Sequence, residues 1–192
     1  MGSASPASRS LLQPGRKTLR PLGLRQVGRS RTRTADHGWW LIVVEFQPSR
    51  WSQGSHLNVG TMWLWRDTSH LGFDHGHRVR EHVGFRNEAQ FAEVADRLTA
   101  DLPSRPTVWD RYHLGMASAL TGRADRARSA FQRMREEPAD GRPWLVELQD
   151  LATDLEGLVD DRAGFEAWAS RTVASCRLRL GLPSLGRDAF PG

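Results

Sequence analysis

The spacing of apolar residues changes once along this chain of 192 residues, from the period of a strand to the period of a helix. Residues 38–46 are β-branched and aromatic, and residues 56–65 alternate with a period of two. Because Pro48 and Gly54 supply turn signals between these segments, we expect an antiparallel hairpin. One further short strand fits around residues 77–83.

Beyond residue 86, apolar residues recur at helical spacing in five segments that end at capping residues, proline or glycine. The expected helices cover residues 87–102, 107–120, 124–136, 144–155 and 161–180. The sequence therefore predicts an α+β fold. In this fold a small antiparallel β-sheet, about residues 38–83, packs against a helical C-terminal part, about residues 87–181.

The helix pair at residues 107–136 carries small and large residues at regular positions, namely Leu114-Gly115, Ala127 and Phe131. These positions resemble the packing positions of a tetratricopeptide-type hairpin. The usual tryptophan and tyrosine are missing, and the sequence has no second copy, whereas stacked repeats need about three units. We expect a helical hairpin with the same packing, without a peptide-binding superhelix.

The excess positive charge of the chain lies at its N-terminus. The formal net charge is +5, but residues 1–36 hold eight basic side chains and one acidic side chain. The remaining residues hold 19 basic and 21 acidic side chains, a net charge of −2. The first 36 residues also lack aromatic side chains, so they bury too little apolar surface to offset their ordering entropy. The predicted organisation is a disordered basic tail at 1–36, a single α+β domain at 37–183 and a disordered C-terminus at 184–192.

Three roles fit such a tail. We favour an extension without function over a nonspecific nucleic-acid-binding arm, and we give the least weight to a targeting segment. Nucleic acid is therefore expected as a partner only nonspecifically, through the tail. Lys17 is the only lysine among 27 basic residues, and this arginine bias is typical of a GC-rich bacterial genome.

Several classes of protein are disfavoured by what the sequence lacks. Cys176 is the only cysteine, which excludes an internal disulfide and suits the reducing cytoplasm. It falls on the inner side of a predicted helix, where a thiol behaves as a small apolar group. The longest apolar run, residues 39–44, is far shorter than the roughly 20 residues of a membrane span. Phosphate-loop, G-x-S-x-G and H-E-x-x-H motifs are missing, so we expect no cofactor and no membrane partner.

The most metal-like stretch runs from His70 to His82. If residues 75–77 are extended, His75 and His77 lie on one side of the strand, and Asp74 could join them from a turn. Imidazole and carboxylate groups are suitable ligands for zinc or iron. We nevertheless favour a solvated glycine-containing loop, because a third converging ligand is not evident.

Two further features of the strands admit a functional and a structural interpretation. Glu45 is an acid near the end of an apolar strand, and a water-facing position explains it without a function. Four tryptophans on the paired strands could stack on a base or a sugar, but we favour a role in the core. These tryptophans are Trp39, Trp40, Trp63 and Trp65.

The hairpin carries Val-Val-Glu-Phe-Gln-Pro-Ser-Arg-Trp at 43–51 and Leu-Asn-Val-Gly at 57–60. This pattern resembles an uncharacterised bacterial family, domain of unknown function four-three-zero-four. Its members look like small α+β domains in which a strand ending in F-Q-x-S pairs with a strand reading N-x-G. The resemblance covers about residues 37–102 and implies a fold but no activity. Such domains begin with a helix and a short strand, so we expect the N-terminus of this chain to be truncated or misassigned.

The candidate binding residues cluster at the end of the hairpin. A loop on rigid strands is a common place for a binding surface, and Trp and Arg are frequent at interface hot spots. The competing interpretation, which we favour, is structural: the polar side chains satisfy the turn, Asn58 bridges the strands and Trp51 covers the sheet edge. The candidates are Gln47, Ser49, Arg50, Trp51 and Asn58.

No group of catalytic residues in the sequence outweighs its structural explanation. We therefore favour a non-enzymatic protein-interaction or regulatory module of the bacterial cytoplasm, with a protein partner whose identity the sequence leaves open. The alternative is a small metal-dependent hydrolase that uses the His70–His82 region together with Glu45.

Overall fold

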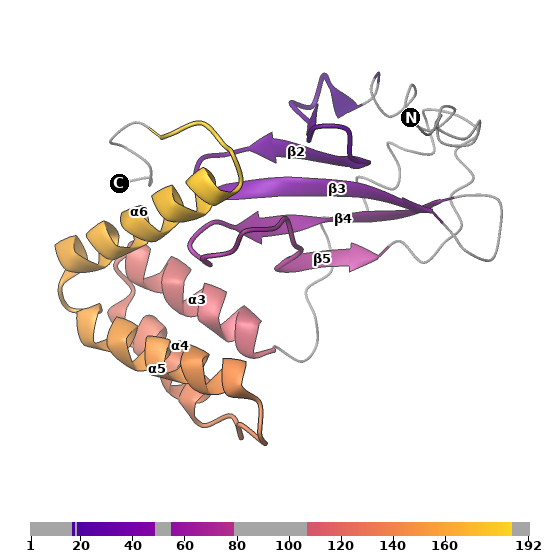
Figure 1. Ribbon diagram of the computed structural model, residues 1–192. Helices are drawn as coiled ribbons and strands as arrows, with labels where there is room; N and C mark the ends of the chain where they lie inside the picture. Colours follow the sequence, from indigo (N-terminus) through magenta and orange to yellow (C-terminus); the bar gives the residue numbers. More distant parts are fainter. Residues whose placement is uncertain (1–16, 18, 49–54, 79–106, 186–192) are drawn as a thin grey trace. The chain divides into compact units, whose positions relative to one another are not determined.

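A computed structural model describes residues 17, 19–48, 55–78 and 107–185 (Figure 1). The predicted single domain at 37–183 divides into two compact units. The sheet unit takes its described residues from 1–62 and 71–102, and the helical unit takes its described residues from 63–70 and 103–192. Among the described residues, the strands lie in the first unit, apart from the last residue of one strand, and the four long helices lie in the second, which confirms the predicted α+β class.

The sheet unit contains a five-stranded sheet in the order β1-β2-β3-β4-β5 (Figure 1). The pairs β1–β2, β2–β3 and β4–β5 are antiparallel. Each strand is therefore the neighbour of the next strand along the chain, as in a meander. The strands are β1 (Arg25–Gln26), β2 (Thr32–Asp36), β3 (Trp40–Pro48), β4 (Ser55–Trp63) and β5 (His75–Arg78).

The sheet begins earlier than predicted, inside the segment that we expected to be a disordered tail. Strand β2 pairs with β3 along all five of its residues, and Leu19, Leu24 and Ala35 are buried. The prediction of a disordered tail at 1–36 is therefore wrong for residues 19–36. Composition averaged over the whole segment hid a short strand that gains its hydrogen bonds from β3 rather than from its own apolar content. Residues 1–16 and 18 lie outside the described residues.

Strands β1 and β2 also fill the place before the hairpin that we expected to lack regular structure. Gly38, which we assigned to the first strand, lies instead in the β2–β3 turn with a φ of 86°. Its amide donates to the Asp36 carboxylate, and the His37 amide donates to the Trp40 carbonyl. Because this turn needs a positive φ, glycine suits it and the strand starts only at Trp40.

One apolar cluster of the sheet unit lies on one face of the sheet. Ile42, Val44 and Phe46 of β3 are two residues apart, so they share a face, and Leu57 and Val59 of β4 pack with them. The opposite face carries the intervening residues of β3, of which Leu41 and Val43 are also almost fully buried. The same cluster also contains Leu19, Leu24 and Ala35.

The helical unit confirms four of the five predicted helices. Observed limits differ from the predicted ones by at most three residues at each end. The helix predicted at 87–102 lies outside the described residues. The four helices are α3 (Val108–Leu120), α4 (Ala124–Arg135), α5 (Pro143–Leu158) and α6 (Arg162–Arg179).

Local chemistry sets the ends of these helices. Thr107 and Asp110 form a capping box, in which each side chain accepts a hydrogen bond from the backbone amide of the other residue. The Asp161 carboxylate accepts from the Gly164 amide at the start of α6. Gly122 and Gly181 follow α3 and α6 with φ near 70°, at 72° and 67°.

Helices α3 and α4 form the predicted helical hairpin. The ring of Phe131 lies so close to Gly115 that an added Cβ atom would overlap it. Phe131, Ala127 and Met116 are fully buried around this contact. A small residue facing a large one therefore sets the close approach of the two helices, as the tetratricopeptide-like pattern predicted. No helix among the described residues is long and apolar enough to span a membrane.

Candidate functional site

Two of the five predicted binding residues lie in the described part of the sheet. Asn58 is buried, and its Nδ2 donates to Glu45 Oε2 at 3.0 Å and to Gln47 Oε1 at 3.3 Å. Asn58 thus bridges β3 and β4 through its side chain. Ser49, Arg50 and Trp51 lie outside the described residues, so the binding surface at the hairpin end stays a prediction.

The histidine stretch is divided between the two units, because His70 belongs to the helical unit and β5 to the sheet unit. His75 and His77 are two apart on β5, opposite Thr61 and Val59. Among the described side chains, no three His, Cys, Asp or Glu residues gather closely enough to hold a metal ion. His82 lies outside the described residues, and the metal site stays a prediction.

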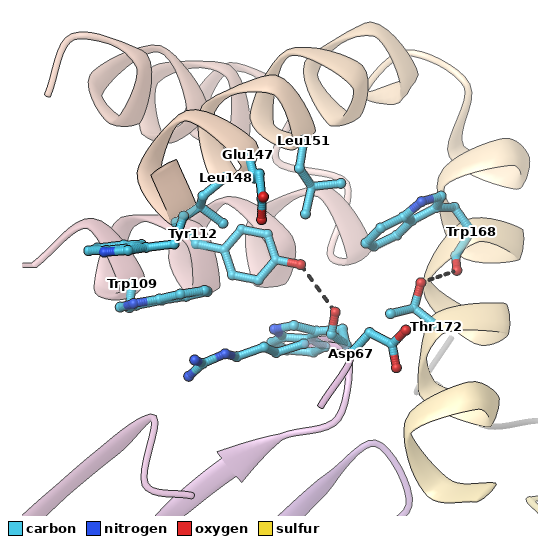
Figure 2. A pocket seen from close by; sticks show the side chains of 11 residues that line it. Asp67, Trp109, Tyr112, Glu147, Leu148, Leu151, Trp168 and Thr172 are labelled. Carbon is cyan, nitrogen blue, oxygen red and sulfur yellow. Dashed lines mark hydrogen bonds between the residues drawn. The ribbon is translucent and has the colours of Figure 1, made fainter. Parts of the chain in front are cut away.

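The helical unit holds a pocket of about 500 Å³ that the sequence did not predict (Figure 2). Segment 63–70 and helices α3, α5 and α6 all contribute to it. Its walls are mainly aromatic and aliphatic, with three charged side chains. The lining residues are Trp65, Arg66, Asp67, Trp109, Tyr112, Trp144, Glu147, Leu148, Leu151, Trp168 and Thr172.

Trp65 anchors the floor of the pocket. It is almost fully buried, and its indole Nε1 donates to His113 Nδ1 at 3.0 Å. The Tyr112 hydroxyl donates to the Trp65 carbonyl at 3.1 Å, and the ring of Trp63 stacks on that of Trp65 at 5.1 Å. These contacts hold segment 63–70 on α3. The prediction of a core role is therefore confirmed for Trp65.

One wall of the pocket is a stack of a cation and two indoles. The guanidinium carbon of Arg66 lies 3.9 Å from the ring centre of Trp109. Trp109 stacks on Trp144 with ring centres 6.1 Å apart and planes 9° from parallel. Trp144 is 43% exposed. Arg66 therefore shows that this site accommodates a guanidinium on an indole face, which is a favourable cation–π arrangement.

The other wall is formed by α5 and α6. Figure 2 shows the Trp168 ring extending into the pocket from α6, with Leu151 and the Glu147 carboxylate reaching in from α5. Trp168 is half-buried, and Phe165 is its only ring neighbour among the described residues. An indole face and a carboxylate thus border the same hollow.

The two carboxylates of the pocket differ in whether they have an ion-pair partner. Asp67 forms an ion pair with Arg179 at 3.0 Å. Glu147, in contrast, has no ion pair or hydrogen bond within the described part of the chain. The lining holds one cation and two carboxylates, and because Asp67 is paired with Arg179, Glu147 is the carboxylate of the lining without an ion pair among the described residues.

The hydroxyl groups of the pocket are committed to backbone carbonyls. Thr172 Oγ1 donates to the Trp168 carbonyl at 3.1 Å, and Tyr112 donates to Trp65. Among the described residues, the Thr172 hydroxyl has no hydrogen bond to a base that would activate it as a nucleophile. Cys176 is fully buried away from the lining, with its Sγ 3.6 Å from the Thr68 carbonyl oxygen, as expected for a small apolar group.

The tryptophans of this pocket are less buried than the apolar spacing of their helices suggests. Trp144 and Trp168 both belong to that spacing, but Trp144 lies at the pocket rim and Trp168 is only half-buried. Trp109 lies three and seven residues before Tyr112 and Met116, so it shares their face of α3, yet it is only half-buried. A large aromatic residue on the core face in the first turn of its helix was the one signal that could have identified this wall.

Comparisons of the chain with protein-family models, with curated proteins and with solved structures found no match. The family resemblance of the hairpin therefore stays a prediction, and the geometry of the pocket carries the functional argument.

Proposed function

We propose that this protein is a non-enzymatic interaction module that receives a protruding side chain of a partner protein in the aromatic pocket of the helical unit. The observation that carries the proposal is the pocket itself. Its volume of about 500 Å³ falls within the usual range for ligand sites, and Trp109, Trp144 and Trp168 remain partly exposed.

The exposure of these indoles supports binding. Burying an indole against a partner stabilises a complex by removing a large apolar area from water, and tryptophan is enriched at interface hot spots. Trp144 and Trp168 keep part of that area exposed in the free protein. The floor beneath them is held by Trp65 and His113, so the pocket is formed before a partner arrives.

The chemistry of the lining supports binding over catalysis. Its two hydroxyls donate to backbone carbonyls, and its carboxylates are not placed with a nucleophile. The alternative of a metal-dependent hydrolase rests on the His70–His82 region together with Glu45, and residues 79–82 of that region lie outside the described ranges. Metal analysis of the purified protein tests that alternative directly, because stoichiometric zinc or iron that is lost in His75→Ala would favour it.

A panel of 12-residue peptides tests the proposal. The peptides share a Gly-Ser background and carry basic, acidic, aromatic or aliphatic residues at two positions. We expect at least one class to bind the full chain, and Trp168→Ala to weaken that binding by about tenfold or more. Fluorescence anisotropy of labelled peptides measures the affinities.

Trp39→Ala is the matched control, because Trp39 is also a half-buried tryptophan but lies in the sheet unit. It should leave peptide affinity unchanged. Equal binding by wild type and Trp168→Ala, or no binding of any class, would contradict the proposal. Thermal unfolding of each variant verifies that the pocket variant is folded.

A further inference from the structure

The charges around the pocket indicate which side chain it receives, and this step rests on the function proposed above. Helix α5 contains four acidic residues and no basic residue. Glu147, Asp150 and Asp154 follow a spacing of three and four residues, so they lie on one face of α5 over about 10 Å. We call these three residues the acidic face of α5.

The acidic face of α5 lacks counter-charges within the described part of the chain. All three residues are exposed, and none has a partner there in an ion pair or hydrogen bond. The fourth acid, Glu156, is paired with Arg135 of α4 at 2.5 Å. Beyond the helix, Asp160 pairs with Arg128, and their hydrogen bond raises the pKa of the guanidinium.

Arg135 of α4 therefore neutralises Glu156 of α5, whereas the acidic face of α5 keeps no counter-charge within the described part of the chain. That face begins at Glu147, whose carboxylate reaches into the pocket opposite the Trp168 ring (Figure 2). A cation seated there would contact an indole face and a carboxylate together. A phosphate or carboxylate ligand seated there would instead lie against the Glu147 carboxylate, which is unfavourable.

We infer that the pocket binds an arginine side chain from an extended segment of a partner protein, with the acidic face of α5 attracting further basic residues of that segment. A guanidinium suits this site because it is planar, stacks on indoles and donates to carboxylates in a fork. Arg66 on Trp109 already shows that stacking within the pocket, at 3.9 Å. The partner's guanidinium occupies the remaining indole surface, beside Trp168 and Glu147.

The test uses four 12-residue Gly-Ser peptides with two arginine, citrulline, lysine or glutamate residues at positions 4 and 8. Citrulline has nearly the shape of arginine without its charge. We expect the arginine peptide to bind the full chain about tenfold or more tightly than the citrulline peptide, and more tightly than the lysine peptide. The affinity should fall as sodium chloride is raised.

Variants identify the groups that recognise the cation. Glu147→Gln should weaken binding of the arginine peptide by about five- to tenfold, and Asp150→Asn with Asp154→Asn by about two- to fivefold. Glu166→Gln is the matched control, because Glu166 lies on α6 in an ion pair with Arg162 at 2.7 Å. It should leave the affinity unchanged.

The outcomes separate this inference from the proposed function. If the citrulline or glutamate peptide binds as tightly as the arginine peptide and Trp168→Ala still abolishes binding, the cation inference fails and the proposed function stands. Absence of any Trp168-dependent binding contradicts both. If free arginine binds as tightly as the arginine peptide, the ligand is a small molecule, and the inference of a partner protein is overturned.

The basic side chains at the chain's own N-terminus are the remaining candidate occupant. Arg9→Ala with Arg16→Ala in the full chain distinguishes the two sources of arginine. Unchanged affinity for the arginine peptide supports an external partner. An increase in affinity would show that these arginines compete for the pocket, and would overturn the inference of an external partner.

Discussion

In the sheet unit, the buried amide of Asn58 donates to both Glu45 and Gln47, so these polar groups satisfy one another. In the helical unit, Glu147 reaches into a pocket without a partner among the described residues, beside the half-buried ring of Trp168. The two carboxylates thus differ: Glu45 accepts a hydrogen bond from a buried side chain, whereas Glu147 has no partner among the described residues.

This difference separates structural groups from groups available to a ligand. A polar group that is buried and paired contributes to stability, and removing its partner leaves an unsatisfied group. A carboxylate and an indole that stay partly exposed contribute little to folding and can gain more from a partner. Stability measurements on matched variants therefore test whether the two kinds of group differ in this way.

The largest effect is expected at the helical hairpin. Phe131 is fully buried against Gly115, so Phe131→Ala should lower the free energy of unfolding by about 3–5 kcal/mol. Phe73, which is 41% exposed, is the control, and Phe73→Ala should cost about 1 kcal/mol or less. Urea denaturation measures both. Similar losses for the two variants would show that the helical core is not the rigid support of the pocket.

A somewhat smaller effect is expected in residues 19–36, which belong to the sheet unit and not to a disordered tail. Leu19 is 2% exposed in the sheet core, so Leu19→Ala should cost about 2–4 kcal/mol. Leu22, three residues later, is 60% exposed, and Leu22→Ala should change stability by about 0.5 kcal/mol or less. Equal stability of the two variants in urea would restore the prediction of a tail without a packed role.

The polar bridge of the sheet should contribute less than either core. Asn58→Ala removes the donor to Glu45 and Gln47, and we expect a loss of about 1–3 kcal/mol. Gln47 is exposed, so Gln47→Ala should cost less than about 1 kcal/mol. Thermal unfolding with calorimetry compares them. A neutral Asn58→Ala would remove the structural role that we assign to the bridge.

The smallest effect on folding is expected at the acidic face of α5. Asp150→Asn with Asp154→Asn removes like charges that are exposed and without counter-charges among the described residues, so stability should change by about 0.5 kcal/mol or less. Any change should be towards higher stability at low salt, because repulsion is relieved. A loss of more than about 1 kcal/mol in urea would assign these residues a structural role and weaken the comparison.

The candidate site was only partly predictable because its residues come from segments that are distant along the chain. Trp65 meets His113 across 48 positions, and Arg66 lies on Trp109. Neither contact has a local sequence signal, since the spacing of apolar residues reports only which face of an element is buried. The hairpin candidates, by contrast, were chosen from neighbouring positions, and Asn58 does bridge the strands beside Gln47.

The α+β class, the four described helices, the helical hairpin and the burial of Cys176 could all be predicted from the order of the residues. Each of these follows from periodicity, capping residues or small-residue spacing, which act over a few neighbouring positions. The strand pairing of residues 32–36 and the aromatic pocket became evident only in the folded structure. The physical reason is that a strand takes its hydrogen bonds, and a pocket takes its walls, from segments brought together only when the chain folds.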